Sequence, residues 1–161
     1  MHNKSFEHEL IKGRIAETIF EMMFRETKKF TVLHFGYEYT EPILSQYRNM
    51  ANMAVVQKVI EEVSKSPDYI LVTEDKQQVY IVEVKFRHIL NEKELLGIAE
   101  KVYERYPICY IFLATLDNFY FDTVSNIMNQ KGAIKQLSTS WVSQEIQGKN
   151  KKLVKEFLYS S

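Results

Sequence analysis

The sequence predicts an α/β fold in which helices flank a mixed β-sheet. Segments with helical periodicity alternate with short runs of β-branched and aromatic residues, and one run, Ile108 to Ala114, is continuously apolar. An unbroken apolar run of this length is typical of a strand covered on both faces. The resulting order of helix, strand, helix, hairpin, helix and strand favours an α/β sandwich.

The first expected helix runs from about Phe6 to Glu26. Helical spacing places six residues on one of its faces: Phe6, Leu10, Gly13, Glu17, Phe20 and Phe24. The opposite side is also apolar, with Ile11, Ile15, Ile19 and Met22. We therefore expect this helix to be apolar nearly all round and largely buried. The run from Phe30 to Phe35 then predicts a strand.

The next part of the chain predicts a loop, a second helix and a hairpin. Residues 37–48, which contain Pro42, are expected to form the loop, and residues 49–64 the helix. Ser66 and Pro67 end that helix. Two strands follow, Asp68 to Thr73 and Val79 to Arg87, and a polar turn around Lys76 joins them.

Beyond the hairpin we expect a helix, the buried strand and a helical tail. Asn91 is the expected N-cap, with Glu94 in the capping-box position, and Pro107 marks the end of the helix. Cys109, inside the apolar run, is interpreted as a core residue rather than a nucleophile. Residues 119–124 predict an edge strand, and residues of about 125–161 a basic helical tail.

Composition favours one domain and excludes several classes of protein. The 161 residues carry no net charge, so the chain is not a polycation of the histone type. No apolar run reaches the roughly 20 residues that span a bilayer, and the first residues lack the apolar segment of a secretory signal. A single cysteine excludes an internal disulfide. We therefore expect a cytoplasmic protein with no membrane partner.

Charge is nevertheless unevenly distributed along the chain. Residues 1–130 carry 15 Lys and Arg against 19 Asp and Glu, whereas residues 131–161 carry 6 against 2. One interpretation of the basic end is a solvated, lysine-rich terminal helix. The other is a surface that binds a nucleic-acid backbone beside an acidic metal site. The sequence leaves both interpretations open.

The expected hairpin contains the residues that are informative about function. Glu83 and Lys85 share one face of their strand because strand side chains alternate. If the hairpin closes around Lys76, paired residue numbers sum to about 152, which places Asp68 across from Val84 and diagonal to Glu83 and Lys85. Charged groups that converge at the ends of apolar strands are costly unless they are paired or bound to metal. We therefore interpret Asp68, Glu83 and Lys85 as one site.

The acid-x-Lys pattern occurs at three places, and only its context distinguishes them. Two examples end a helix or lie in a turn, whereas Glu83-Val84-Lys85 lies in a buried strand that pairs with Pro67-Asp68. Pro67-Asp68, a strand, and then Glu83-Val84-Lys85 resembles the signature of the PD-(D/E)XK nuclease superfamily. The resemblance covers about residues 6–115, with an insertion at about residues 37–66. It implies a single restriction-endonuclease-like domain, an α/β/α sandwich around a mixed sheet.

This resemblance also implies a function. We expect a Mg²⁺- or Mn²⁺-dependent nuclease that hydrolyses phosphodiester bonds, with DNA favoured over RNA, and more specifically an endonuclease of repair, recombination or defence. By resemblance, Asp68, Glu83 and the Val84 carbonyl would hold the ion, and Glu17 would be a direct or water-mediated ligand. Lys85 would orient the attacking water or stabilise the charge that develops on phosphorus. Members of the superfamily often dimerise to cut two strands, so a homodimer is among the implied arrangements.

Each of these residues also has a purely structural interpretation. Asp68 could begin a strand or cap the preceding turn, Glu83 and Lys85 could form a solvated cross-strand face, and Glu17 could lie at the surface. For the whole chain, the alternative is a catalytically silent nuclease-like fold that serves as a nucleic-acid-binding or protein-assembly module. The acidic balance of residues 1–130 favours that alternative. The four histidines lack zinc-type spacing. Arg87 and His88 could contact a phosphate, but we interpret them as a solvated strand end.

Overall fold

Five strands form one mixed sheet in a computed structural model that describes residues 4–35, 58 and 65–159. The strands, which lie side by side in chain order, are β1 (Phe30–His34), β2 (Tyr69–Thr73), β3 (Val79–Phe86), β4 (Tyr110–Ala114) and β5 (Phe119–Thr123). β3 and β4 are parallel, and the other neighbours in this sheet are antiparallel. The predicted mixed sheet is therefore present, with β5 at one edge as expected.

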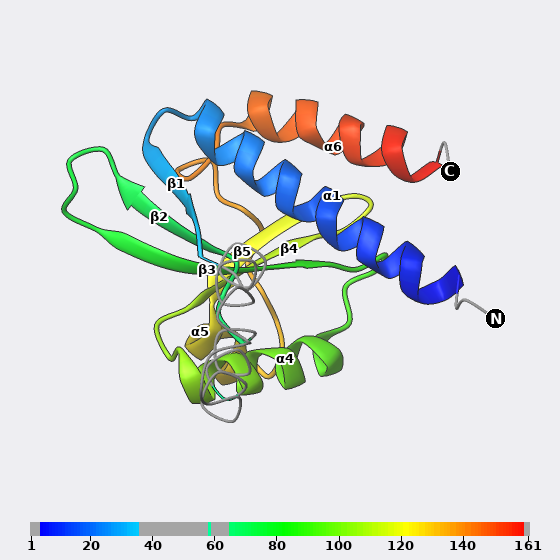
Figure 1. Ribbon diagram of the computed structural model, residues 1–161, viewed down its shortest axis with the longest axis horizontal. Coiled ribbons are helices and arrows are strands. Elements are labelled where there is room, and N and C mark those ends of the chain that lie inside the picture. The colour runs from blue at the N-terminus through cyan, green and yellow to red at the C-terminus, as the bar shows by residue number, and fades with distance from the viewer. Residues whose placement is uncertain (1–3, 36–57, 59–64, 160–161) are drawn as a thin grey trace, which may run out of the picture.

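Helices cover both faces of the sheet (Figure 1). The long helices α1 (Lys4–Glu26) and α6 (Gln144–Tyr159) lie side by side on one face, and α4 (Glu92–Arg105) and α5 (Val124–Asn129) lie on the other. β4 separates two apolar cores, because Phe112 belongs to the core under α1 whereas Ile111 and Leu113 belong to the core under α4. The prediction of a strand covered on both faces is confirmed for Tyr110–Ala114, whereas Ile108, at the start of the apolar run, precedes the strand and is 71% exposed.

The first helix is buried on one face only. Ala16, Ile19, Phe20, Met23 and Phe24 are buried against the sheet. On the other side, however, Ile11 is 57% exposed and Met22 is 44% exposed. The expectation of a largely buried helix was wrong for this outer side, because α6 packs beside α1 rather than over it (Figure 1). It was also wrong for Leu10, which was expected on the first face and is 52% exposed.

The β2–β3 hairpin turns at Lys76, as predicted, but its register differs by one residue from the prediction. Lys76 has a left-handed backbone with φ of 56°. The pairs run from Tyr69↔Val82 to Val72↔Val79, so Asp68 is not opposite Val84. A one-residue shift moves a side chain to the other face of a sheet. The observed register is the one that brings Asp68 to the face of Glu83 and Lys85.

The start of α4 confirms the predicted cap but only half of the predicted capping box. The Glu94 N–H donates to Asn91 Oδ1 at 3.0 Å. The Glu94 carboxylate does not return to Asn91 but pairs with Arg87 Nε at 2.5 Å. The helix ends at Arg105, before Pro107, and buries Leu95 and Ala99. Glu94 thus ties the helix to the end of β3.

The C-terminal third is a packed part of the fold, with one side of its last helix buried. α5 follows β5 directly with Thr123 as its N-cap, and α6 buries Gln147, Asn150 and Val154. The Gln147 amide donates to the carbonyls of Leu137 and Val142, which fixes α6 to the preceding turn. Among the described helices, none is long and apolar enough to cross a membrane.

Three predictions fall almost entirely outside the described residues. These are the loop at 37–48, the helix at 49–64 and the insertion at about 37–66 that contains them. Of this stretch, the structure describes only residues 58, 65 and 66.

Candidate functional site

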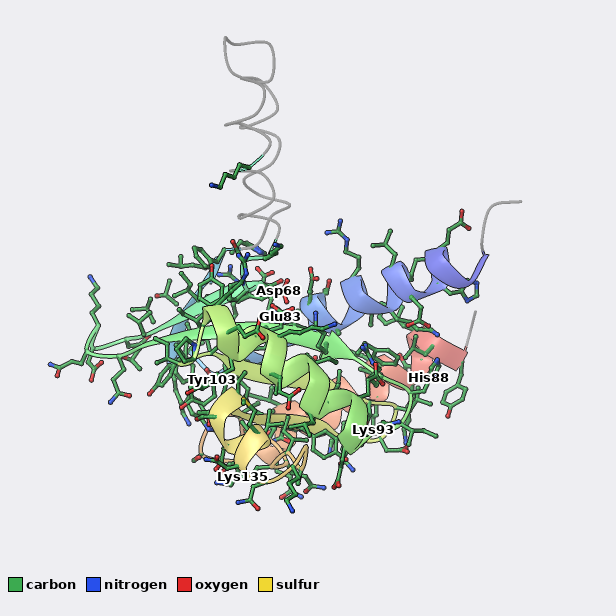
Figure 2. All side chains as sticks on the ribbon, turned by 90° about the horizontal axis from the view of Figure 1, so that it is seen from below. Asp68, Glu83, His88, Lys93, Tyr103 and Lys135 are labelled. Atoms are coloured by element: carbon green, nitrogen blue, oxygen red, sulfur yellow. The ribbon has the colours of Figure 1, made fainter. Side chains whose placement is uncertain are left out.

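Asp68 lies at the start of β2, where its backbone is held on both sides. Its carbonyl accepts a hydrogen bond from the Phe35 N–H at 2.9 Å, and its own N–H donates to the Val82 carbonyl at 3.1 Å. The side chain is held as well, because Asp68 Oδ2 accepts from the Val84 N–H at 2.7 Å. Figure 2 shows Asp68 and Glu83 close together between α1 and α4. The carboxylate is therefore fixed against β3 rather than turned to solvent.

Glu83 and Lys85 point to the same face of β3, as the alternation of strand side chains predicts. Their neighbours Val82, Val84 and Phe86 are buried in the opposite core, which determines the direction of the charged pair. Lys85 Nζ donates to Glu83 Oε1 at 2.5 Å, and the two side chains are only 31% and 15% exposed, respectively. The pair is therefore not a solvated cross-strand pair.

The electrostatics of Asp68 reflect its crowding with other acids. Burial, followed by the nearby Glu83 carboxylate, raises the pKa of Asp68 from 3.8 to about 7, and Glu17 contributes in the same direction. The Val84 N–H and the Lys85 ammonium oppose this shift without cancelling it. The carboxyl group is therefore partly protonated at neutral pH in the absence of a further cation.

Lys85 remains a cation in this cluster. Burial alone lowers the pKa of Lys85, but the Glu83 and Asp68 carboxylates more than reverse that effect and hold the pKa above its usual value. Its ammonium is therefore protonated at neutral pH, as expected for a lysine beside two carboxylates.

α1 contributes Glu17 to the same place. A pocket of about 640 Å³ is lined by Glu17, Asp68, Val84 and Lys85, together with residues at the end of β3. The Tyr69 hydroxyl donates to the Glu17 carbonyl at 3.4 Å, which joins α1 to the start of β2. Glu83 lines the adjoining pocket and is connected to this one through Lys85. The four side chains singled out in the sequence thus come from three elements and gather in one region.

The donor atoms of this cluster fit a hard divalent cation. Carboxylate oxygens suit Mg²⁺, and a cation here would offset the repulsion that raises the pKa of Asp68. Within the described ranges, no three Asp, Glu, His or Cys side chains gather tightly enough to form a metal-ligand group. Mg²⁺ needs no such group, since it is commonly bound through one or two carboxylates and keeps several waters. Asp68 and Glu83 meet that lower requirement.

All the ligand roles remain predictions, including those of the Val84 carbonyl and Glu17. The Val84 N–H is bonded to Asp68, and its carbonyl would be the backbone ligand implied by the resemblance. Glu17 lines the pocket of Asp68 but has the weakest of the charge effects that shift the pKa of Asp68. This weak coupling fits the water-mediated role better than direct coordination.

The sequence patterns did not predict several charged residues that lie near the site. On the α1 side, Lys12 Nζ lies 2.7 Å from His88 Nε2 and 3.0 Å from Glu9 Oε1. On the α4 side, Lys101 and Arg105 line the pocket that contains Glu83. Their i, i+4 spacing on a helix was the available signal, because such residues share one side.

Cys109 is confirmed as a core residue. It is fully buried under α4 and α5. Burial, followed by the negative charge of Glu83, raises the pKa of the Cys109 thiol to about 12. A thiol with so high a pKa supplies almost no thiolate at neutral pH, and the thiolate is the nucleophilic form.

The site thus consists of two adjacent carboxylates and an ammonium group, with a third carboxylate at the edge of the pocket. No family model matches this chain, and no curated protein matches it in sequence. The chemistry of the site is therefore inferred from its own side chains and their geometry.

Proposed function

We propose that this protein is a Mg²⁺-dependent nuclease of the PD-(D/E)XK type, which hydrolyses phosphodiester bonds in DNA. The observation that carries the proposal is the convergence of Asp68 and Glu83 beside Lys85 at one end of the β2–β3 hairpin. A strand-starting or turn-capping aspartate would not need a second carboxylate against it. Part-buried acids that lie close together are costly, and the Lys85 ammonium does not cancel the rise in the pKa of Asp68, so the arrangement favours a further cation.

The proposed reaction assigns a role to each side chain. Asp68 and Glu83 would hold Mg²⁺, with the Val84 carbonyl as a backbone ligand and Glu17 acting through water. The bound ion would polarise the scissile phosphate and lower the pKa of the attacking water. Asp68 must first release its proton to solvent, because the protonated carboxyl is a poor ligand. The Lys85 ammonium would then orient the water or stabilise the charge developing on the phosphoryl oxygens.

The fold supports the same proposal at a coarser level. A mixed sheet with helices on both faces is compatible with the restriction-endonuclease-like architecture that the resemblance implies. The resemblance also implies that the substrate is DNA. It further implies that a homodimer is the form that cuts both strands.

Incubation with nucleic acids tests the activity directly. Plasmid, linear, branched and single-stranded DNA, with an RNA of matched length, would be incubated with the protein in Mg²⁺ or Mn²⁺. We expect the parent protein to cut DNA and Asp68→Ala not to cut it. The control is Asp117→Ala, which removes an exposed carboxylate that contacts Lys155 far along the chain. Absence of cleavage by the parent protein, or equal cleavage by Asp68→Ala, would refute the proposal.

A specific observation favours a second candidate function, protein assembly without catalysis. An apolar groove of about 470 Å³ lies between α1 and α6 and is lined by Ile11, Met22 and Phe157 among others. Exposed apolar surface of this kind often marks a protein contact. Calorimetry with Mn²⁺ separates the candidates, since a catalytic site binds the ion through Asp68 and Glu83 whereas an assembly module need not.

A further inference from the structure

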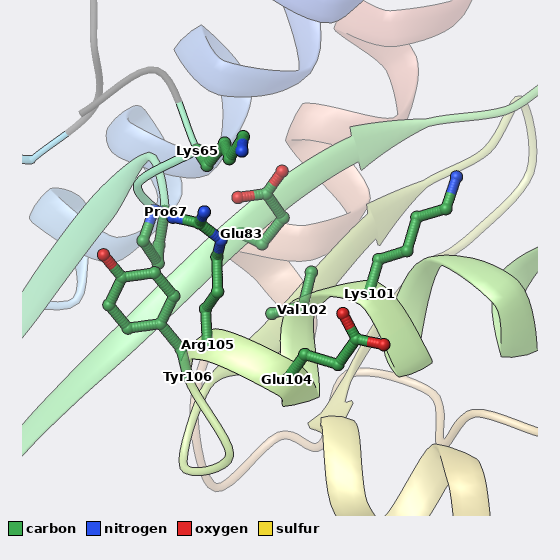
Figure 3. Close-up of a pocket in the computed structure, with 8 residues that line it drawn as sticks. All are labelled: Lys65, Pro67, Glu83, Lys101, Val102, Glu104, Arg105 and Tyr106. Atoms are coloured by element: carbon green, nitrogen blue, oxygen red, sulfur yellow. The ribbon is translucent and has the colours of Figure 1, made fainter. Parts of the chain in front are cut away.

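A second groove lies beside Glu83, on the α4 side of the sheet. It has a volume of about 460 Å³, and its lining includes Lys65, Glu83, Lys101 and Arg105. Figure 3 shows the Lys65 and Arg105 side chains reaching toward Glu83 from opposite sides, with Lys101 one helical turn before Arg105 on α4. All three cationic side chains belong to exposed residues. The groove is thus open to solvent and shares one carboxylate with the candidate metal site.

The charges that line the two neighbouring pockets differ in sign. The groove on the α4 side has three cationic residues against two carboxylates, Glu83 and Glu104. The pocket on the α1 side has Lys85 and Arg87 against four carboxylates, Glu9, Glu17, Asp68 and Glu94. A divalent cation would therefore favour the α1 side, whereas a phosphate group would favour the α4 side. Glu83, which lines the groove and bonds Lys85, lies between the two.

We propose that the groove on the α4 side is a phosphate-binding subsite, which holds the nucleic-acid strand at a phosphate next to the scissile one. This inference rests on the proposed nuclease function and deepens it, because it states where the strand lies. Arg105 offers a planar fork that matches phosphate oxygens, and Lys65 and Lys101 offer point charges. Lys101 and Arg105 are four residues apart on α4 and so act from one side of the helix.

A pair of double variants tests the subsite. Lys101→Ala/Arg105→Ala removes two charges from the groove, and Lys93→Ala/Lys135→Ala removes two exposed charges that do not line it. Lys93 lies on the same helix, near its start, and Figure 2 shows both control lysines away from Asp68 and Glu83. Binding of a fluorescein-labelled DNA duplex would be measured by anisotropy in EDTA at several NaCl concentrations.

We expect the groove variant to lose about 30-fold in affinity at about 150 mM salt, and its log–log salt slope to fall by about 1.8, from two lost phosphate contacts. The control pair should stay within about twofold of the parent protein. Lys101→Arg/Arg105→Lys should keep the slope because it keeps both charges. Equal affinity and slope in the groove and control variants would overturn the subsite.

Cleavage in Mg²⁺ separates failure of the subsite from failure of the nuclease proposal. If the subsite is correct, the groove variant has a raised KM and a kcat near that of the parent protein, because Asp68, Glu83 and Lys85 are unchanged. A parent protein that cuts DNA while the groove variant binds normally would refute the subsite alone. A parent protein that never cuts, but loses affinity with the groove charges, would refute the nuclease and support the groove as a phosphate site.

Discussion

At the residue scale, Asp68 experiences opposing effects on the ionisation of its carboxyl group. The Val84 N–H and Lys85 stabilise its charged form, whereas burial and the Glu83 carboxylate disfavour it more strongly. The protein therefore keeps a carboxyl group in a place where its ionisation is costly. Costs of this kind are concentrated at functional sites, where the strained group gains a ligand or a reaction.

This cost predicts how the stability of the metal-free protein depends on pH. The pKa of Asp68 is raised in the folded state, from 3.8 to about 7, so the folded protein binds more protons than the unfolded chain between these values. The free energy of unfolding must then decrease as pH rises through that range and level off above it. Asp68→Asn removes this contribution, so its melting temperature in EDTA should change less between pH 5 and about pH 8 than that of the parent.

The comparison needs a control for the other groups around the cluster. Glu17, Glu83 and Lys85 remain in the variant, so the difference between the two pH profiles reports Asp68 together with its coupling to these groups. Above about pH 7, Asp68→Asn should melt about 3 °C or more above the parent protein, as expected from roughly 1 kcal/mol in a chain of this size. Identical pH profiles for the two proteins would show that Asp68 ionises freely.

Lys85 should matter for the rate of cleavage and not for the affinity of the ion. Lys85→Ala should lower the rate by about 100-fold or more, the usual effect of losing transition-state electrostatics. Mn²⁺ affinity should stay the same or increase, because the ammonium that bonds Glu83 has gone. Lys85→Arg should not restore the rate, since a planar fork does not replace a compact ammonium. Cleavage by Lys85→Ala at the parent rate would contradict this role.

At the element scale, the contacts of the α6 lysines distinguish between the two interpretations of the basic tail. Lys149 Nζ lies 2.5 Å from Glu26 Oε1, Lys155 Nζ lies 3.4 Å from Asp117 Oδ1, and Lys151 donates to the Asn118 side chain. α6 also lies beside α1, on the face of the sheet opposite α4 (Figure 1). These contacts favour a solvated structural helix over a surface that binds the nucleic-acid backbone.

Two changes in α6 test this interpretation. Truncation after Gln147 should lower the free energy of unfolding by about 3 kcal/mol or more, because it removes Val154 from the core. Lys149→Ala/Lys155→Ala should leave the salt slope of DNA binding unchanged and cost less than about 1 kcal/mol for each exposed ion pair. Denaturant unfolding and anisotropy measure the two effects. If the log–log salt slope of DNA binding falls by roughly 0.9 per lysine, the tail instead binds the phosphates of the nucleic-acid backbone.

The elements also show which predictions local sequence could support. The cap at Asn91 and the turn at Lys76 were predicted because both depend on a few neighbouring residues. The register of the hairpin was not, since it depends on the backbone of the turn, and a lysine with positive φ leaves no mark in the sequence. The exposure of Ile11 and Met22 was missed because it depends on where α6 packs, a contact across more than a hundred residues.

At the scale of the whole molecule, the site exists because two neighbouring strands of the sheet differ in length. β3 is longer than β2, so Glu83, Val84 and Lys85 extend past the last β2–β3 pair, Tyr69↔Val82. α1 borders this end on one side and α4 on the other, which creates the acidic and the basic pocket. The motif in the sequence identified the residues at the centre. It could not identify the two pockets, because part of their lining comes from helices distant in the sequence, such as Glu17 on α1 and Lys101 on α4.

This arrangement predicts that ion binding stabilises the entire fold. Asp68 directly precedes β2, Glu83 lies in β3 and Glu17 lies in α1, so an ion that they share binds only the folded chain. At about 100 times its dissociation constant, such a ligand adds about 2.7 kcal/mol, or roughly 5–10 °C in melting temperature for a chain of this size.

Melting curves in increasing Mn²⁺ measure this effect, and pH provides an internal test. A proton competes with the ion for Asp68, whose pKa is about 7, so the stabilisation should be greater at about pH 8 than at about pH 6. Asp68→Asn should lose most of the stabilisation at both values, whereas Asp117→Ala should keep it. Because Asp117 is an exposed carboxylate outside both pockets, equal shifts in the two variants would indicate nonspecific binding. No shift in the parent protein at the higher pH would mean that Asp68 and Glu83 do not form an ion site.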